Sequence, residues 1–169
     1  MSARRSAGVE RAEARLAQRE VRSYEAEYVG GLYHWDAHHG SLKVITRRAE
    51  WVRPILFGVL DDRSRLICHL QWYLGSECAQ DVAHGLSQAF MRRGVPRAAL
   101  SDNGSAMLAE EITEGLARLG ILHETTLAFS PYMNAKSETL WSTVEGRLMA
   151  MLEGVPDLTL EFLNEATQA

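Results

Sequence analysis

The order in which strand-like and helix-like segments follow one another constrains the fold of this chain most strongly. Three strand patterns come first, and the turn-forming string Asp61-Asp62-Arg63-Ser64 joins the second to the third. Helical and strand patterns then alternate. The expected strands are 32–39, 53–60, 66–74, 97–101 and 121–126, and the expected helices are 76–93 (with Ser76 as its N-cap), 107–119, 134–153 and 157–169. This order predicts an α/β fold with a five-stranded mixed sheet flanked by helices.

Glycine and proline positions divide the chain into three regions. Residues 1–29 are rich in Ala, Arg and Glu and predict one charged helix, either a packing helix or an arm that touches DNA or a partner. Gly30-Gly31 then opens the main domain, residues 30–156. Residues 157–169 follow a Gly-Val-Pro break and are expected to form a short C-terminal helix.

Charge is distributed unevenly along the chain, which has a net charge of −4. Residues 1–109 hold 15 Lys and Arg against 12 Asp and Glu, whereas residues 110–169 hold 3 against 10. An acidic total argues against tight, autonomous DNA binding, but a metal ion can offset clustered carboxylates. The two cysteines form no CxxC pair, and there is no apolar run of about 18 residues or apolar leader, which predicts a cytoplasmic protein without a membrane segment.

Asp102 stands where an apolar strand pattern ends in turn-forming residues, Asn103-Gly104-Ser105. By itself this string is typical of a turn. Asp36 lies in the middle of the first strand pattern, where an acid is unfavourable unless it is solvated, paired or bound to a metal. Because side chains alternate along a strand, His34 and His38 share the face of Asp36, and both a zinc site and a polar loop edge remain open for these histidines.

Asp36, Asp102 and Glu138 are expected to meet at one edge of the sheet. If the first and fourth strands are neighbours, the two aspartates lie one strand spacing, about 4.8 Å, apart. Glu138 lies about one turn into the helix after the fifth strand and can lean over the same edge. Two divalent cations would balance three carboxylates, and hard oxygen ligands favour magnesium or manganese. The rival pair Asp61 and Asp62 is expected to be solvated, as hairpin acids usually are.

The order and spacing of these motifs resemble the DDE catalytic core shared by bacterial insertion-sequence transposases and retroviral integrases, over roughly residues 30–153. Asp102 and Glu138 are separated by 35 intervening residues, the usual spacing of that family. The matching segments are Trp35-Asp36, Leu60-Asp61-Asp62-Arg63-Ser64-Arg65, Ser101-Asp102-Asn103-Gly104-Ser105 and Ser130-Pro131-Tyr132-Met133-Asn134-Ala135-Lys136-Ser137-Glu138. The resemblance implies a ribonuclease-H-like fold.

The resemblance also implies an activity, metal-dependent DNA strand cleavage and strand transfer. Asp36, Asp102 and Glu138 would hold two Mg2+ or Mn2+ ions that activate water or a DNA 3′-hydroxyl and stabilise the leaving oxygen. The expected partners are transposon-end and target DNA, together with a second copy of the chain or other transposase subunits. The expected place of action is the bacterial nucleoid.

Three further residues are candidates for DNA contact. Asn103 would fix its turn or bind a phosphate, and Lys136, at a helix start, would meet a phosphate or be an exposed solubilising lysine. Arg147 is the one strong cation on the helix after Glu138. Other positions on that helix, Ser142 and Glu145, are not basic, whereas the retroviral relatives carry lysines there.

Several alternatives to an active transposase remain open. The chain has no helix-turn-helix pattern upstream of the core and no basic tail, so we expect a catalytic core without its DNA-recognition modules. It could be a catalytically silent remnant that binds DNA or transposase subunits. It could also be a ribonuclease-H-like nuclease that cuts RNA–DNA hybrids. The plainest alternative is an unrelated α/β domain whose acids lie on the surface.

Overall fold

The computed structural model describes residues 26–126 and 135–168 of the chain. The strands are β1 (Leu32–His39), β2 (Val44–Ile45), β3 (Trp51–Val52), β4 (Ile55–Asp61), β5 (Ile67–Tyr73), β6 (Ala98–Ser101) and β7 (Leu122–Thr125). The helices are α2 (Ala79–Arg93), α3 (Glu110–Arg118), α4 (Ala135–Thr143), the π-helical segment η2 (Val144–Met149), α5 (Ala150–Leu152) and α6 (Leu160–Gln168). None of the helices in these ranges has the length and apolarity needed to cross a membrane.

The main sheet has five strands in the order β5-β4-β1-β6-β7, which confirms the predicted mixed sheet. β1 lies at its centre, antiparallel to β4 and parallel to β6. β4 is fully buried along its length, as expected for a strand with packed layers on both faces. The first and fourth strands of the sequence analysis, β1 and β6, are therefore neighbours, which was the condition for bringing their aspartates together.

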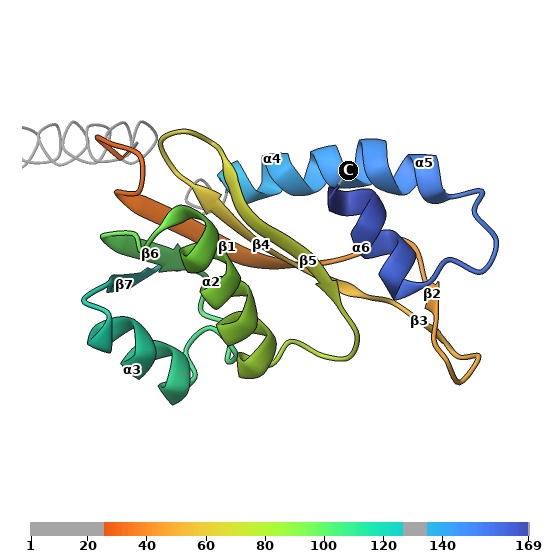
Figure 1. Ribbon diagram of the computed structural model, residues 1–169, viewed down its shortest axis with the longest axis horizontal. Helices are drawn as coiled ribbons and strands as arrows, with labels where there is room; N and C mark the ends of the chain where they lie inside the picture. The colour runs from red at the N-terminus through yellow and green to blue at the C-terminus, as the bar shows by residue number, and fades with distance from the viewer. Residues whose placement is uncertain (1–25, 127–134, 169) are drawn as a thin grey trace, which may run out of the picture.

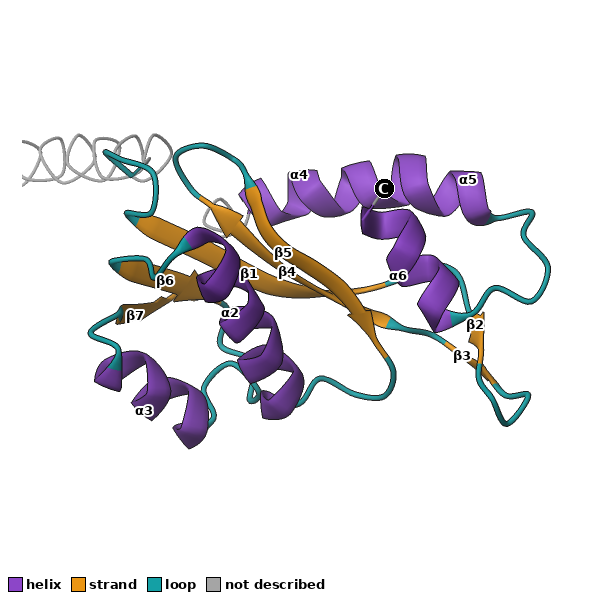
Figure 2. Cartoon of the chain, viewed as in Figure 1, coloured by secondary structure: helices purple, strands orange, loops and turns teal. Residues whose placement is uncertain are grey.

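Helices cover both faces of the sheet (Figures 1 and 2), with α2 and α3 on one face and α4, α5 and α6 on the other. On the α2 and α3 side, Tyr33 and Trp35 of β1 belong to the larger hydrophobic core. On the opposite side, Leu56 of β4 and Trp72 of β5 pack in a second core with Trp141 of α4. The alternate residues of β1 therefore face α4, as the period of two predicts for His34, Asp36 and His38.

The helices predicted over 107–119 and 157–169 form as α3 and α6, which begin three residues later, at Glu110 and Leu160. Two other predicted helices also differ from those in the structure. The first begins at Ala79 with Cys78 as its N-cap, rather than at Ser76, and Asp81 in its first turn interacts favourably with the helix dipole. The helix predicted over 134–153 forms as α4, η2 and α5 in succession, so its middle is π-helical. The predicted helix over residues 1–28 lies almost wholly outside the described residues.

The expectation that Asp61 and Asp62 are solvated is wrong, because their relative exposures are 1% and 0%. Asp61 closes the β4–β5 turn by accepting hydrogen bonds from the Ser64 amide at 2.7 Å and hydroxyl at 2.6 Å. It also accepts the Gly30 amide at 2.7 Å, and the Asp62 carboxylate accepts the Ala26 amide at 2.6 Å. The two acids are buried because they satisfy backbone donors of the segment that leads into β1.

Candidate active site

Asp36, in the middle of β1, and Asp102, directly after the carboxyl end of β6, lie at neighbouring positions of two parallel strands. The register between β1 and β6 pairs His34 with Leu100, and two further positions along each strand lead to Asp36 and Asp102. Asp102 directly follows the last residue of β6 and is partly exposed. The proximity also has an electrostatic effect, since the charge of Asp102 helps to raise the pKa of Asp36.

The Asp36 carboxylate is held by two hydrogen bonds. Its Oδ1 accepts the Ala37 amide at 2.8 Å, and its Oδ2 accepts the indole N–H of Trp141 at 3.0 Å. Burial raises the pKa of Asp36, the two hydrogen bonds oppose that effect, and the neighbouring charges of Asp102 and Glu77 add to it, for a net rise. A carboxylate in this state gains most from a cation that replaces its lost hydration.

Trp141 owes its place beside Asp36 to a glycine on the next strand. Gly58 of β4 pairs with Asp36, and a Cβ atom at Gly58 would come within 2.7 Å of the Trp141 ring. The missing side chain leaves room for the indole to lie against the sheet. The ring is also stacked on His38, with centroids 5.4 Å apart and planes at 14°.

Glu145 continues the line of contacts along β1. Its Oε1 lies 2.9 Å from His38 Nε2 and accepts the Ser41 amide at 3.1 Å. Burial opposes the charged form of Glu145, but hydrogen bonds from Ser41 and His38 outweigh burial and lower its pKa. The Glu145 carboxylate is therefore engaged in contacts at the end of β1.

The Asp102 turn has the local structure that its sequence predicts. Asp102 Oδ1 accepts the Gly104 amide at 3.0 Å, and Asn103 donates its side-chain amide to the Thr126 carbonyl at 2.8 Å. Ser101 Oγ lies 2.9 Å from His123 Nε2. Asn103 therefore ties the turn to the end of β7 here, while its side chain remains at the surface.

Lys136 and Glu138 occupy the first turn of α4 with different surroundings. Lys136 donates to the buried carboxylate of Asp62, which also lies 2.7 Å from His34 Nε2. Burial opposes the charge on Asp62, yet hydrogen bonds from His34, Lys136 and the Ala26 amide hold its pKa well below the usual range. Glu138 is exposed, one helical turn before Trp141.

The structure thus brings Asp36 and Asp102 together, while Glu138 stands apart from the pair. Residues 26–126 and 135–168 contain no group of three His, Cys, Asp or Glu side chains placed to hold a metal ion. His34 and His38 share the face of Asp36, but each is paired with another carboxylate, Asp62 or Glu145. Arg147, the remaining candidate, is exposed on η2.

The aspartate pair fits a hard divalent cation. Mg2+ is commonly bound through one or two carboxylates while it keeps several waters, and Asp36 and Asp102 offer only oxygen donors. Their mutual repulsion, with the partial burial of Asp36, is the cost that such a cation would relieve. The chemistry available to this donor set is stabilisation of charge on phosphate oxygens and activation of water.

Sequence analysis did not identify Trp141 and Gly58 as part of this site. Trp141 carries a usable signal, since it lies three residues after Glu138 and so on the same side of α4. Gly58 has no such signal, because its role depends on the register between β4 and β1, which pairs it with Asp36.

A mixed sheet of this strand order, with two aspartates side by side at its centre, defines a ribonuclease-H-like domain. The model of the integrase core domain family matches residues 27–131, and the chain belongs to that family. The match includes Asp36 and Asp102 and ends before Glu138. Comparison with curated proteins by sequence gives no match.

Several solved structures that are similar to this chain are retroviral integrases. A chain of the simian T-cell lymphotropic virus intasome, solved with the PP2A regulatory subunit B56 gamma, has a TM-score of 0.68 and 18% identity over 85% of this chain and 49% of its own. The HTLV-2 integrase catalytic core domain in complex with magnesium (trimeric form) has a TM-score of 0.62 and 19% identity, over 84% and 85% of the two chains. The catalytic core domain of BIV integrase has a TM-score of 0.58 and 21% identity, over 79% of this chain and 78% of its own. The chain thus spans about half the length of the intasome chain.

Proposed function

We propose that this chain is the catalytic core of a DNA transposase or integrase, in which Asp36, Asp102 and Glu138 hold two Mg2+ or Mn2+ ions. The observation that carries the proposal is the juxtaposition of Asp36 and Asp102 on neighbouring parallel strands of an integrase core domain. Glu138 is included because it lies on α4, one turn before Trp141, which contacts Asp36. The HTLV-2 core, which has the same fold, is in complex with magnesium.

Each side chain has a defined task in this proposal. The Asp36 carboxylate is oriented by Trp141 and the Ala37 amide, and the Asp102 carboxylate by the Gly104 amide, so both oxygen pairs are held before substrate arrives. Glu138 adds its carboxylate from the helix. When bound, the ions would supply Lewis-acid stabilisation of the phosphate and a more acidic attacking water or 3′-hydroxyl.

The same proposal specifies the DNA substrates and the partner subunits. Strand transfer joins two DNA molecules, so transposon ends and target DNA are the substrates, and a second copy or other transposase subunits would bring the ends together. Recognition of particular ends would come from outside this core. The proposed place of action is the bacterial nucleoid, because the proposed substrate is DNA. Asn103, Lys136 and Arg147 remain candidates for contact with that DNA, although Lys136 would have to exchange its bond with Asp62 for one with a phosphate.

Nicking of a short DNA duplex in Mg2+ or Mn2+ tests the proposal. The unaltered chain is expected to nick the duplex, and Asp102→Asn and Glu138→Gln are expected to lower the rate at least about a hundredfold. Glu153→Gln, an exposed acid at the end of α5, is the matched control and should leave the rate unchanged. Metal titration followed by NMR should show weaker Mg2+ binding in Asp102→Asn.

The same assay separates the alternatives. Metal binding that depends on Asp102, together with intact folding but no nicking in any variant, would identify a catalytically silent DNA- or subunit-binding module. Preferential cutting of RNA–DNA hybrids over duplex DNA would identify a ribonuclease-H-like nuclease instead. Mg2+ binding that Asp102→Asn does not alter would count against a metal site at this pair of strands.

A further inference from the structure

A short hairpin stands apart from the main sheet between β1 and β4. Its strands are β2 and β3, and it lies beyond the carboxyl end of β1, beside α6 (Figure 1). Val44 is fully buried, and the Ile45 amide donates to the Leu158 carbonyl at 2.8 Å, so one edge is fixed to the C-terminal region. We call residues 43–53 the β2–β3 hairpin.

The register of the hairpin gathers its side chains into a basic, aromatic face. Ile45 pairs with Trp51 and Val44 with Val52, so Ile45 and Trp51 share the face opposite to buried Val44. Lys43 directly precedes β2 and Arg53 directly follows β3, so an exposed cation flanks each strand at the same end of the hairpin.

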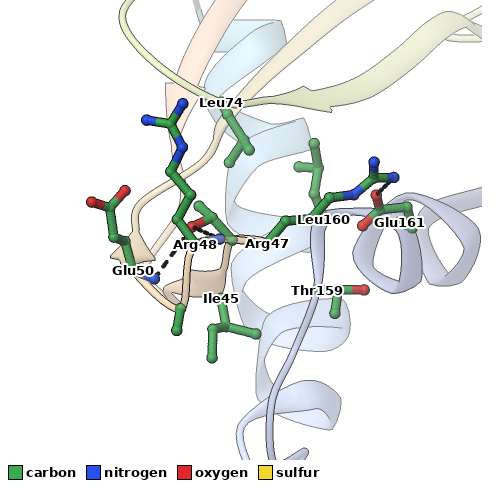
Figure 3. A pocket seen from close by; sticks show the side chains of 10 residues that line it. Ile45, Arg47, Arg48, Glu50, Leu74, Thr159, Leu160 and Glu161 are labelled. Carbon is green, nitrogen blue, oxygen red and sulfur yellow. Dashed lines mark hydrogen bonds and ion pairs between the residues drawn. The ribbon is translucent and has the colours of Figure 1, made fainter.

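The tip of the hairpin adds two more cations. Thr46 Oγ1 accepts the amides of Arg48 and Glu50 at 3.3 and 3.2 Å, which fixes the turn that carries Arg47 and Arg48. In Figure 3 the Arg47 guanidinium reaches Glu161, at 3.5 Å, whereas Arg48 extends away from that pair. Both partners of the pair are exposed, at 95% and 67% of their side chains, so water screens it strongly.

A pocket of about 670 Å³ lies between the tip and the start of α6. Its apolar walls include Ile45, Leu74 and Leu160, and its rim carries Arg47 and Arg48 (Figure 3). Trp51 stands outside it with 52% exposure. Among the described residues, no carboxylate forms an ion pair with Lys43, Arg48 or Arg53.

We propose that the β2–β3 hairpin binds the phosphate backbone of duplex DNA next to the aspartate pair, an inference that rests on the proposed function for its substrate. The hairpin carries four exposed cations (Lys43, Arg47, Arg48 and Arg53), against three exposed acids on it or beside it, Glu50, Asp157 and Glu161, on an otherwise acidic chain. A DNA backbone supplies a line of anions to such a surface, and Trp51 can pack against the sugars.

The hairpin lies within reach of DNA held at the site. Nine residues separate Asp36 from Ile45 in the numbering, which spans at most about 30 Å even when fully extended. One turn of B-DNA covers about 34 Å. The hairpin therefore lies no farther from Asp36 than about one helical turn of a duplex.

Duplex binding by the full chain, in EDTA and at varied salt, tests this inference without any chemical step. The probe is a duplex of about 30 base pairs, roughly three helical turns. Two double variants, Lys43→Gln with Arg53→Gln and Arg47→Gln with Arg48→Gln, should each bind at least about tenfold more weakly at low salt. Each should also reduce the slope of log K against log salt by about 2.

A matched control removes two exposed cations from the opposite side of the sheet, with Arg92→Gln and Arg118→Gln on α2 and α3. It should retain most of the affinity and the slope. Hairpin variants that bind as the control does would overturn the inference, as would undetectable duplex binding by the unaltered chain. A change in oligomeric state without a change in DNA affinity would instead identify the hairpin as a subunit contact.

The outcome is independent of nicking. Hairpin-dependent binding by a chain that never nicks DNA would support the surface and contradict the proposed reaction. If the chain nicks DNA in a metal-dependent way but its hairpin variants bind DNA normally, the proposed reaction is supported and the proposed hairpin surface is contradicted. Thermal unfolding of each variant by circular dichroism checks folding, and removal of the Lys43 and Arg53 pair should not lower the melting temperature.

Discussion

Trp141 donates its indole N–H to Asp36 at 3.0 Å and so joins α4 to the central strand at a carboxylate of the candidate site. The bond uses one oxygen of Asp36, while the Ala37 amide uses the other. It favours the charged form of a carboxylate that burial and Asp102 push toward protonation. Trp141 therefore acts on the proposed metal site as a positioning residue, without being a ligand.

Trp141→Phe should raise the pKa of Asp36 further, because the substitution removes a donor to the charged form while it keeps an aromatic ring beside His38. Loss of a hydrogen bond to a charged group should also lower the free energy of unfolding by about 1–2 kcal/mol. NMR titration of the Asp36 side-chain carboxyl carbon measures the first effect, and urea unfolding measures the second.

Trp72→Phe is the matched control for this prediction. Trp72 also donates its indole N–H, at 2.9 Å to Thr167 Oγ1, but it does so on β5, away from the aspartates. Its loss should cost stability and leave the pKa of Asp36 and the affinity for Mg2+ unchanged. An Asp36 pKa that is unaltered by Trp141→Phe would show that the indole only fills space.

Gly58→Ala should destabilise the protein by about 1–3 kcal/mol, because its Cβ would come within 2.7 Å of the rigid Trp141 ring. The indole would have to move from Asp36, so this variant should also weaken Mg2+ binding. Urea unfolding and metal titration measure the two effects. In combination with Trp141→Phe, whose smaller ring leaves space, the cost should be less than additive.

Gly115→Ala provides the contrast. A Cβ at Gly115 in α3 meets no atom within 4 Å, and Ala has the higher helix propensity, so the variant should gain roughly 0.5–1 kcal/mol. If Gly58→Ala costs the same stability with and without Trp141→Phe, its cost does not come from a clash with the indole.

The order of helices and strands along the chain and the Asp102 turn could be predicted because they follow from local patterns, whereas the adjacency of β1 and β6, the condition for neighbouring aspartates, comes from the structure. Strand alternation placed Asp36 on the face with His34 and His38, and the Asn103-Gly104 string located the turn. The parallel pairing of β1 and β6 then follows from the connection through α2, as such crossovers usually dictate.

The partners of α4 could not be predicted in this way. Two contacts of α4 and one of the following η2 run along β1 in order: Lys136 reaches His34 through Asp62, Trp141 reaches Asp36, and Glu145 of η2 reaches His38. Each depends on how the helix lies on the sheet, which no local pattern specifies. For the same reason, the sequence predicted that Lys136 contacts a phosphate or solvent and that Asp62 is solvated, and the ion pair between them was not predicted.

Asp62→Asn should lower the free energy of unfolding by about 2–4 kcal/mol, because it leaves the Lys136 ammonium beside a buried group that no longer balances its charge. The carboxylate is fully buried, so water does not screen the loss. Chemical denaturation at pH 7 measures the effect. Glu114→Gln, which breaks the exposed pair with Arg118, should cost less than about 0.5 kcal/mol.

The low pKa of Asp62 also gives this stabilisation a pH dependence. An acid whose pKa is lower in the folded state stabilises the protein above its unfolded pKa, near 4, and loses that effect as the pH falls. The difference in stability between the unaltered chain and Asp62→Asn should therefore shrink below about pH 4. A constant difference would mean that charge is not the source of the effect.

His69 should make the protein less stable in mild acid. It is 1% exposed on β5, and burial, followed by the charges of Arg92 and His84, lowers its pKa to about 4. Between that value and the unfolded pKa, near 6.5, the unfolded chain binds a proton that the folded one does not, so stability rises with pH. The loss between pH 7.5 and 5.5 should be about 1 kcal/mol, measured by urea unfolding at both values.

His69→Phe isolates this contribution, because it removes the titrating group and keeps a ring in the core beside Gly85 of α2. The unaltered chain should lose about 1 kcal/mol more than the variant over the same pH interval, since all other titrating groups are shared. His39→Gln, at an exposed histidine, should behave as the unaltered chain does. Equal pH slopes for His69→Phe and the unaltered chain would mean that His69 takes up its proton in the folded state as readily as in the unfolded one.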